Sequence, residues 1–227
     1  NPFRVVSALD AAGEKGRSVT YAKGFSNEND SMTEQELEKA LRTAAEADVA
    51  VIFAGLPEIF ESEGYDRTSM KLPKCQDRLI EEVLKVQPNV VVVLHNGSPV
   101  ELPWADRVSA ILEMYLGGQG VGEACDRLLF GEANPSGRLS ETFPYRLEDN
   151  PSFLHFPGNG KRVLYGEDIF VGYRYYDTKK VPVRYAFGHG LSYTEFTYGD
   201  LTLSSAQMTD EDILTVSLKV KNSGKTE

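Results

Sequence analysis

The run from Val90 to Leu94 restricts the possible folds of this chain more than any other stretch. It contains four valines and a leucine with no polar residue between them. A β-branched run without polar alternation is typical of a strand that is buried on both faces, as in a parallel sheet covered by helices. The run is too short to cross a bilayer, which takes about 20 residues as a helix. The sequence therefore predicts the centre of an α/β sheet.

Helical and strand patterns alternate around this run. Thr33 to Glu36 has the form of a capping box, and the apolar residues after it recur at helical spacing. The predicted helices cover 34–47, 75–86 and 123–130, and the predicted strands cover 17–23, 48–55, 90–94 and 110–115. We expect the strand at 48–55 to be buried on both faces. Such alternation implies right-handed crossovers and an open, mostly parallel sheet covered by helices.

The pattern changes twice towards the C-terminus. From about Asn134 the chain is rich in proline, glycine and aromatic residues without a clear period, which indicates a long surface segment. From Leu201 apolar residues alternate with the period of half-buried antiparallel strands. A β-sandwich needs about 100 residues. We therefore predict an α/β domain over 1–190 and a truncated all-β sandwich module over 191–227.

The net charge of −10 and the pI near 4.9 exclude some partners. An acidic chain repels phosphate backbones and anionic membrane surfaces, so neither nucleic acid nor a membrane is an expected partner. Cys75 and Cys125 lack metal-ligand spacing and are interpreted as small apolar residues near helices rather than a disulfide.

An acidic heptapeptide, ESEGYDR, covers residues 61–67 and follows the predicted strand at 48–55. Ligands of open α/β sheets bind at the carboxyl ends of strands. Glu61 and Glu63 lie two residues apart, and neighbouring carboxylates raise the pKa of a carboxyl group that must deliver a proton. Gly64 allows close approach of a ligand, and Arg67 could orient Asp66 through a bidentate pair. By composition alone, a solvated acidic loop is the simpler interpretation.

Other motifs favour structural roles. The glycine loop at 117–122 lacks the third glycine of a dinucleotide fingerprint and indicates a strand-to-helix turn. His95, His155 and His189 are far apart and have no ligand spacing, so packing or hydrogen bonding is expected and no metal is predicted.

Two further sets of residues suggest no chemistry of their own. Ser98 and Ser192 lack the context of a serine nucleophile. Tyr173, Tyr175 and Tyr176 are most simply core and cover residues, with sugar stacking as the alternative.

Several motifs in order resemble one known family. They are ESEGYDR followed by Leu72-Pro73, VVVLHNGSPVELPW, LFGEANPSGRLSETFP, YGEDIFVGYRYYD and FGHGLSYTEF. Together they resemble the C-terminal half of glycoside hydrolase family 3, specifically its β-glucosidases, over about residues 15–200. The tail from Leu201 is similar to the start of a fibronectin type III-like domain.

This resemblance implies a retaining β-glucosidase acting on a β-glucoside or oligosaccharide without a cofactor or metal. In such enzymes an α/β sandwich domain supplies the general acid/base glutamate, and a barrel domain supplies the aspartate nucleophile. The glutamate before the Gly-Tyr pair is Glu63, with Glu61 as the runner-up. The resemblance thus reverses the simpler interpretation of the acidic heptapeptide.

One departure from the family pattern is large. The chain has no Ser-Asp-Trp tripeptide of the kind that carries the nucleophile. We therefore expect a fragment of a longer β-glucosidase, inactive alone, or a separate half that pairs with a barrel domain. A β-xylosidase and a non-catalytic carbohydrate-binding or interface module are the alternatives.

Overall fold

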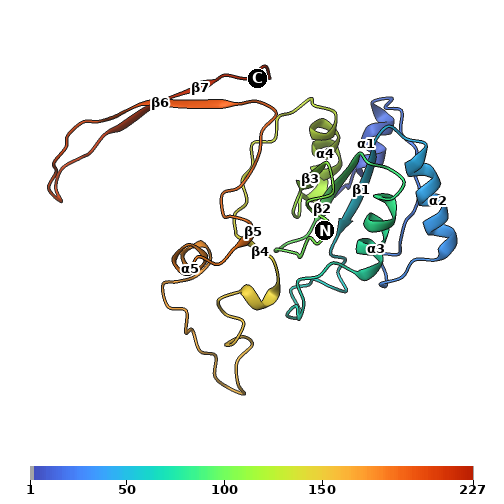
Figure 1. Cartoon of the computed structure of the whole chain (residues 1–227), viewed down its shortest axis with the longest axis horizontal. Coiled ribbons are helices and arrows are strands. Elements are labelled where there is room, and N and C mark those ends of the chain that lie inside the picture. The colour runs from blue at the N-terminus through green and yellow to red at the C-terminus, as the bar shows by residue number, and fades with distance from the viewer. Residues whose placement is uncertain (1–2, 227) are drawn as a thin grey trace. The chain divides into compact units, whose positions relative to one another are not determined.

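The computed structural model describes residues 3–226 of the chain (Figure 1). The helices are α1 (Ala8–Glu14), α2 (Glu34–Ala45), α3 (Lys74–Val83), α4 (Val121–Leu129) and α5 (Tyr173–Lys179), with short 3₁₀ turns at Gly118–Gly120 and Leu147–Asp149. The strands are β1 (Ala50–Gly55), β2 (Val90–His95), β3 (Ala110–Glu113), β4 (Phe143–Pro144), β5 (Val183–Tyr185), β6 (Phe196–Leu203) and β7 (Val216–Asn222).

The valine run forms β2, the central strand of a parallel sheet with the order β1-β2-β3. Ala50 pairs with Val90 and Gly55 with His95, while Val91 pairs with Ala110. Because all three strands are parallel, their carboxyl ends lie along one edge of the sheet. The prediction of an α/β domain with a parallel sheet is confirmed.

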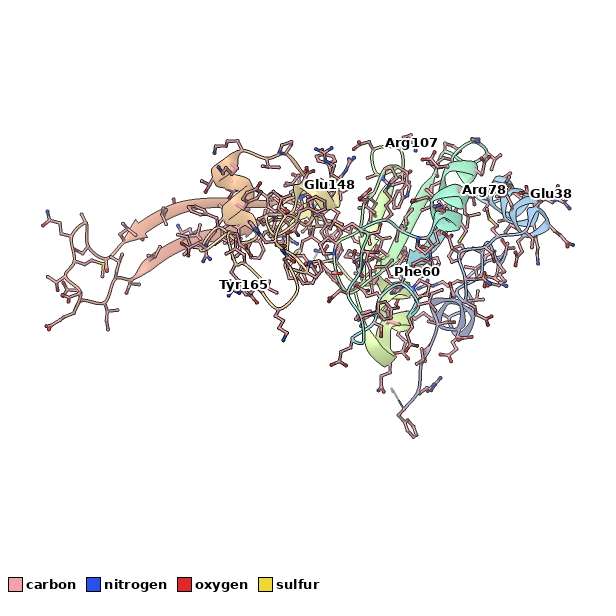
Figure 2. All side chains as sticks on the ribbon, turned by 90° about the horizontal axis from the view of Figure 1, so that it is seen from below. Glu38, Phe60, Arg78, Arg107, Glu148 and Tyr165 are labelled. Atoms are coloured by element: carbon pink, nitrogen blue, oxygen red, sulfur yellow. The ribbon has the colours of Figure 1, made fainter. Side chains whose placement is uncertain are left out.

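Helices α2 and α3 lie side by side on one face of this sheet (Figure 1). The predicted capping box begins α2, because the Thr33 hydroxyl accepts from the Glu36 N–H and the Glu36 carboxylate accepts from the Thr33 N–H. Leu37 of α2 and Ile80 of α3 pack in one core cluster with the buried β2 residues. Figure 2 shows Glu38 and Arg78 on these two neighbouring helices.

The prediction that β1 is buried on both faces is wrong. Ile52 and Ala54 are buried, but Val51 and Phe53 on the other face are 39% and 40% exposed. As an edge strand, β1 has a neighbour on one side only, and α2 and α3 cover one of its faces. The valine run itself keeps little exposure on either face because it is the central strand.

The predicted strand at 17–23 is also wrong, because these residues form no helix or strand. A strand needs a hydrogen-bonded neighbour, and none of the described sheets includes this segment. Arg17 instead contacts the fully buried Asp126 carboxylate at 3.5 Å, and Lys23 pairs with Glu36 at 3.2 Å.

The segment after Asn134 contains more regular structure than its composition predicts. Strands β4 and β5 pair antiparallel, and the aromatic run forms α5. Tyr176 is buried, which agrees with a core role, whereas Tyr173 is partly exposed and stacks on Phe187 at 5.1 Å. The stretch between β4 and α5 leaves large apolar side chains exposed, among them Tyr165 (Figure 2).

Contacts divide the chain into two compact units. The first contains the sheet, with the residues up to Asp126 and Arg138–His189. The second contains Arg127–Gly137 and the residues from Gly190, and its regular part is the antiparallel hairpin β6-β7, in which Phe196 pairs with Asn222. The predicted antiparallel pairing is confirmed, but the expected half burial is wrong, because every residue of β6 and β7 is exposed. None of the described helices combines the length and the apolar character that a membrane span needs.

Candidate functional site

A loop rich in carboxylates begins directly after β1, and we call residues 56–67 the acid loop. Its start is fixed at Gly55, where the buried Gln76 amide pairs with both backbone groups at 2.9 Å. The next residue, Leu56, donates its N–H to the His95 carbonyl at 2.9 Å. The acid loop therefore leaves the carboxyl edge of the sheet from a defined point.

The middle of the acid loop is a tight turn. Ser62 and Tyr65 form an isolated antiparallel bridge, and the Gly64 N–H donates to the Ser62 hydroxyl at 3.3 Å. The Tyr65 hydroxyl donates to the Glu58 carbonyl. These bonds leave Glu63 and Gly64 at the tip of the turn.

The two candidate acids have different surroundings. The Glu61 carboxylate accepts from the Gly97 N–H at 2.6 Å and from the Ser98 hydroxyl at 2.8 Å, and it lies 3.6 Å from the Arg67 guanidinium. Glu63 is exposed, and within residues 3–226 its carboxylate has no described hydrogen bond or ion pair. Glu61 is thus held by the fold, whereas the Glu63 carboxylate is available to a ligand.

The suggested pair between Arg67 and Asp66 does not form. Arg67 donates to the Ser98 hydroxyl at 2.7 Å and to the Pro99 carbonyl at 3.2 Å, and its ion-pair partner is Glu61. Asp66 is exposed. Adjacent side chains in an extended segment point in opposite directions, so Arg67 can enter the protein while Asp66 faces solvent.

The ends of β2 and β3 continue the polar network below the acid loop. Asn96 is fully buried and donates to the Ser98 carbonyl at 3.0 Å and to the Glu113 carboxylate at 3.2 Å. The other Glu113 oxygen accepts from the Tyr115 N–H at 2.9 Å. Burial raises the pKa of Glu113 to about 7, and the Glu141 and Glu61 carboxylates add to this rise.

The sequence reasoning missed Glu113, Asn96 and Glu141 as parts of this network. A signal for two of them was present, because Asn96 begins an Asn-Gly-Ser-Pro turn after a buried strand and Glu113 is an acid at the end of another. Polar residues in those positions lie at the carboxyl edge of a parallel sheet.

The protonation of Glu113 predicts a pH-dependent stability. Its pKa is raised from 4.5 in the unfolded chain to about 7, so between these pH values the folded chain binds more protons and the free energy of unfolding falls as pH rises. We expect Glu113→Gln to remove this part of the fall. Urea unfolding of both proteins at pH 5 and pH 8 measures it.

Glu38→Gln, which removes an exposed carboxylate of α2 away from this network, is the matched control. The free energy of unfolding of Glu113→Gln and of the original chain should differ by different amounts at pH 5 and pH 8. An equal difference at both pH values would contradict the raised pKa of Glu113.

The remaining motifs have structural surroundings. His95 stacks on Phe53 with ring centroids 6.2 Å apart, and His189 stacks on Tyr185 at 4.9 Å. Gly122 packs so closely on the residues just before α1 that an added Cβ would lie 2.2 Å from the Val6 carbonyl oxygen. Both cysteines are free and buried, as expected. Within the described part of the chain, no cluster of His, Cys, Asp and Glu side chains is arranged to hold a metal ion.

A comparison with protein-family models decides the family. Residues 1–193 match the model described as "Glycosyl hydrolase family 3 C-terminal domain". The chain belongs to glycoside hydrolase family 3. This agrees with the resemblance carried by the ordered motifs, and the acid loop lies inside the matched region.

Curated and solved relatives agree with this family. The chain is 52% identical over 221 residues to "Thermostable beta-glucosidase B" of Acetivibrio thermocellus, which covers 97% of this chain. The crystal structure of a Bifidobacterium adolescentis family 3 β-glucosidase superposes with a TM-score of 0.93 at 40% identity over 98% of this chain. A Kluyveromyces marxianus β-glucosidase solved with glucose superposes with a TM-score of 0.77 at 44% identity over 84% of it.

This family 3 chain is short beside these relatives. It spans 29% of the length of the Acetivibrio protein, 33% of the Bifidobacterium chain and 23% of the Kluyveromyces chain. The relatives therefore contain much sequence that has no counterpart in these 227 residues.

Proposed function

We propose that this chain is the part of a retaining β-glucosidase that supplies the general acid/base, and that Glu63 is that group. The nucleophile comes from a barrel domain outside these residues. The substrate is a terminal β-D-glucosyl residue of a β-glucoside or oligosaccharide, and neither a cofactor nor a metal takes part. Family membership and the names of the β-glucosidase relatives support the substrate class.

The free carboxylate of Glu63 is the observation that carries this proposal. It lies exposed at the tip of a tight turn at the carboxyl edge of the sheet, whereas Glu61 is occupied by three partners. A proton donor must reach the glycosidic oxygen of a bound sugar, and an exposed tip can do so.

In this mechanism Glu63 first donates its proton to the leaving oxygen while the nucleophile attacks the anomeric carbon. The resulting carboxylate then takes a proton from water, which attacks the glycosyl-enzyme and releases glucose. The two carboxyl groups of a retaining enzyme lie about 5 Å apart, so the acid loop has to stand next to the barrel's nucleophile.

The chain alone should not turn over substrate, because half of the catalytic pair is missing. We expect the purified chain to hydrolyse an aryl β-glucoside no faster than a buffer blank, and the longer protein with its barrel to be active. Release of the aryl alcohol measures both. Robust turnover by the chain alone would overturn the division of the catalytic carboxyl pair between two domains. An inactive longer protein that still binds sugar would indicate a carbohydrate-binding module.

The division of the chain also belongs to this proposal. We place an α/β sandwich domain over 1–190 and the beginning of a fibronectin type III-like domain over 191–227. The family model ends at residue 193, and the hairpin β6-β7 follows it, which supports a boundary in this region.

A further inference from the structure

Two charged residues of the acid loop, Glu61 and Arg67, lie on either side of Glu63 and are both turned into the protein. Their side chains are only 19% and 16% exposed, and the Glu61 carboxylate lies 3.6 Å from the Arg67 guanidinium. Glu63 between them is exposed. The tip of the acid loop is thus free, while Glu61 and Arg67 hold the two stems of the loop, one on each side of the tip.

Both stems bind the same short segment, residues 97–99 after β2. Glu61 accepts from the Gly97 N–H and the Ser98 hydroxyl, and Arg67 donates to the Ser98 hydroxyl and the Pro99 carbonyl. The Ser98 hydroxyl therefore links the two stems. An ion pair with shared hydrogen-bond partners restricts position more tightly than a single contact.

The segment 97–99 is itself anchored in the sheet. The buried Asn96 donates to the Ser98 carbonyl and to the Glu113 carboxylate at the end of β3. Gly97 lies close under the acid loop, because an added Cβ would lie 3.2 Å from the Glu61 carboxylate and would press on it. The acid loop is thus tied through one network to the ends of β2 and β3.

Stability alone is a poor reason for such a pair. A buried ion pair loses solvation on both charges, and well-packed apolar side chains often stabilise a protein as much or more. Arg67 is moreover incompletely bonded, since its Nη2 is buried without a hydrogen-bond partner among the described residues. The pair is better suited to fixing a geometry than to strengthening the fold.

We propose that Glu61 and Arg67 are positioning residues for glycoside hydrolysis by this protein. They fix the two stems of the acid loop to residues 97–99 and so hold Glu63 at the glycosidic oxygen. This inference rests on the proposed role of Glu63. A displacement of about 1 Å in a catalytic group can cost about a hundredfold in rate. Loosening these contacts therefore lowers kcat without removing an acid.

The test uses the full-length enzyme with the variants Glu61→Gln, Arg67→Lys and Arg67→Met. We expect the first and third to lower kcat about tenfold to a hundredfold on phenyl β-glucoside, whose leaving group needs a proton, with KM changed less than threefold. Arg67→Lys keeps the charge and should recover part of the loss. On 2,4-dinitrophenyl β-glucoside, whose leaving group needs no proton, the glycosylation step should change little.

Glu58→Gln is the matched control, because Glu58 is an exposed carboxylate of the same loop. Equal kcat values for Glu61→Gln, Arg67→Met and the original enzyme, with only the melting temperature lowered, would overturn the positioning role and leave the role of Glu63 intact. If Glu63→Gln itself kept full activity, the proposed function would fail first. If azide restored the activity of Glu61→Gln as a glucosyl azide product, Glu61 would be the acid/base and the positioning role would fail.

Discussion

In the full-length enzyme, Glu63→Gln is expected to lower kcat on phenyl β-glucoside by about 10²–10⁴-fold, the usual contribution of a general acid/base. The amide cannot donate a proton to the leaving oxygen or take one from water. On 2,4-dinitrophenyl β-glucoside, whose leaving group needs no proton, KM should fall, because the glycosyl-enzyme accumulates when its hydrolysis lacks a base. Steady-state and burst kinetics with the two substrates measure both effects.

Two observations separate a lost acid/base from a damaged loop. With 2,4-dinitrophenyl β-glucoside the glycosylation burst should persist, because that leaving group departs without a proton. Azide needs no general base, so it should restore turnover and give glucosyl azide. Glu58→Gln should behave like the original enzyme. An activity of Glu63→Gln within threefold of the original, or a larger azide-rescued loss for Glu61→Gln, would move the acid/base away from Glu63.

Gly55→Ala is expected to destabilise the chain by about 4 kcal/mol or more. Gly55 has φ +151°, a backbone conformation that L residues rarely adopt, and an added Cβ would lie 2.0 Å from the His95 carbonyl oxygen. That oxygen belongs to β2 and already accepts from the Leu56 N–H, so it cannot move away cheaply. Strain and overpacking each cost about 1–3 kcal/mol, and here they act together with the loss of the Gln76 pairing. Urea unfolding measures the change.

Gly13→Ala is the matched control. Gly13 lies in α1, is exposed and has no atom within 4 Å of the added Cβ, so alanine should stabilise the helix by up to about 1 kcal/mol. A Gly55→Ala protein within 1 kcal/mol of the original would show that the carboxyl end of β1 can rearrange, and the acid loop would then lack its fixed starting point.

Much of the α/β part of the fold could be predicted because each element carries its own local signal. The capping box at Thr33, the helical spacing that follows it and the valine run of β2 depend on neighbours within a few residues. The prediction of a strand at 17–23 failed because a strand also depends on a partner elsewhere in the chain. The weak alternation of this segment is local, but the segment pairs with none of the described strands.

The candidate site, too, could be predicted from the sequence only in part. The position of the acid loop at the end of β1 follows from the order of strand and loop in the sequence. The partners of its charges do not, because Glu61 and Arg67 bind residues more than 30 positions away. Those contacts depend on the register that pairs Gly55 with His95, and a shift by one residue would turn the side chains of a strand to its other face.

The amino-acid pattern was enough to predict the parallel sheet, the helices on it, the family, and an acidic loop where such sheets bind ligands. Which carboxylate of that loop is bound and which is free became clear from the three-dimensional contacts. The spacing of apolar residues indicates which face of a helix or strand is buried. A hydrogen bond requires two specific atoms within about 3 Å of each other, which spacing does not specify. The register of β1 on β2 brings Gly97 and Ser98 to Glu61 and leaves Glu63 exposed at the tip of the acid loop.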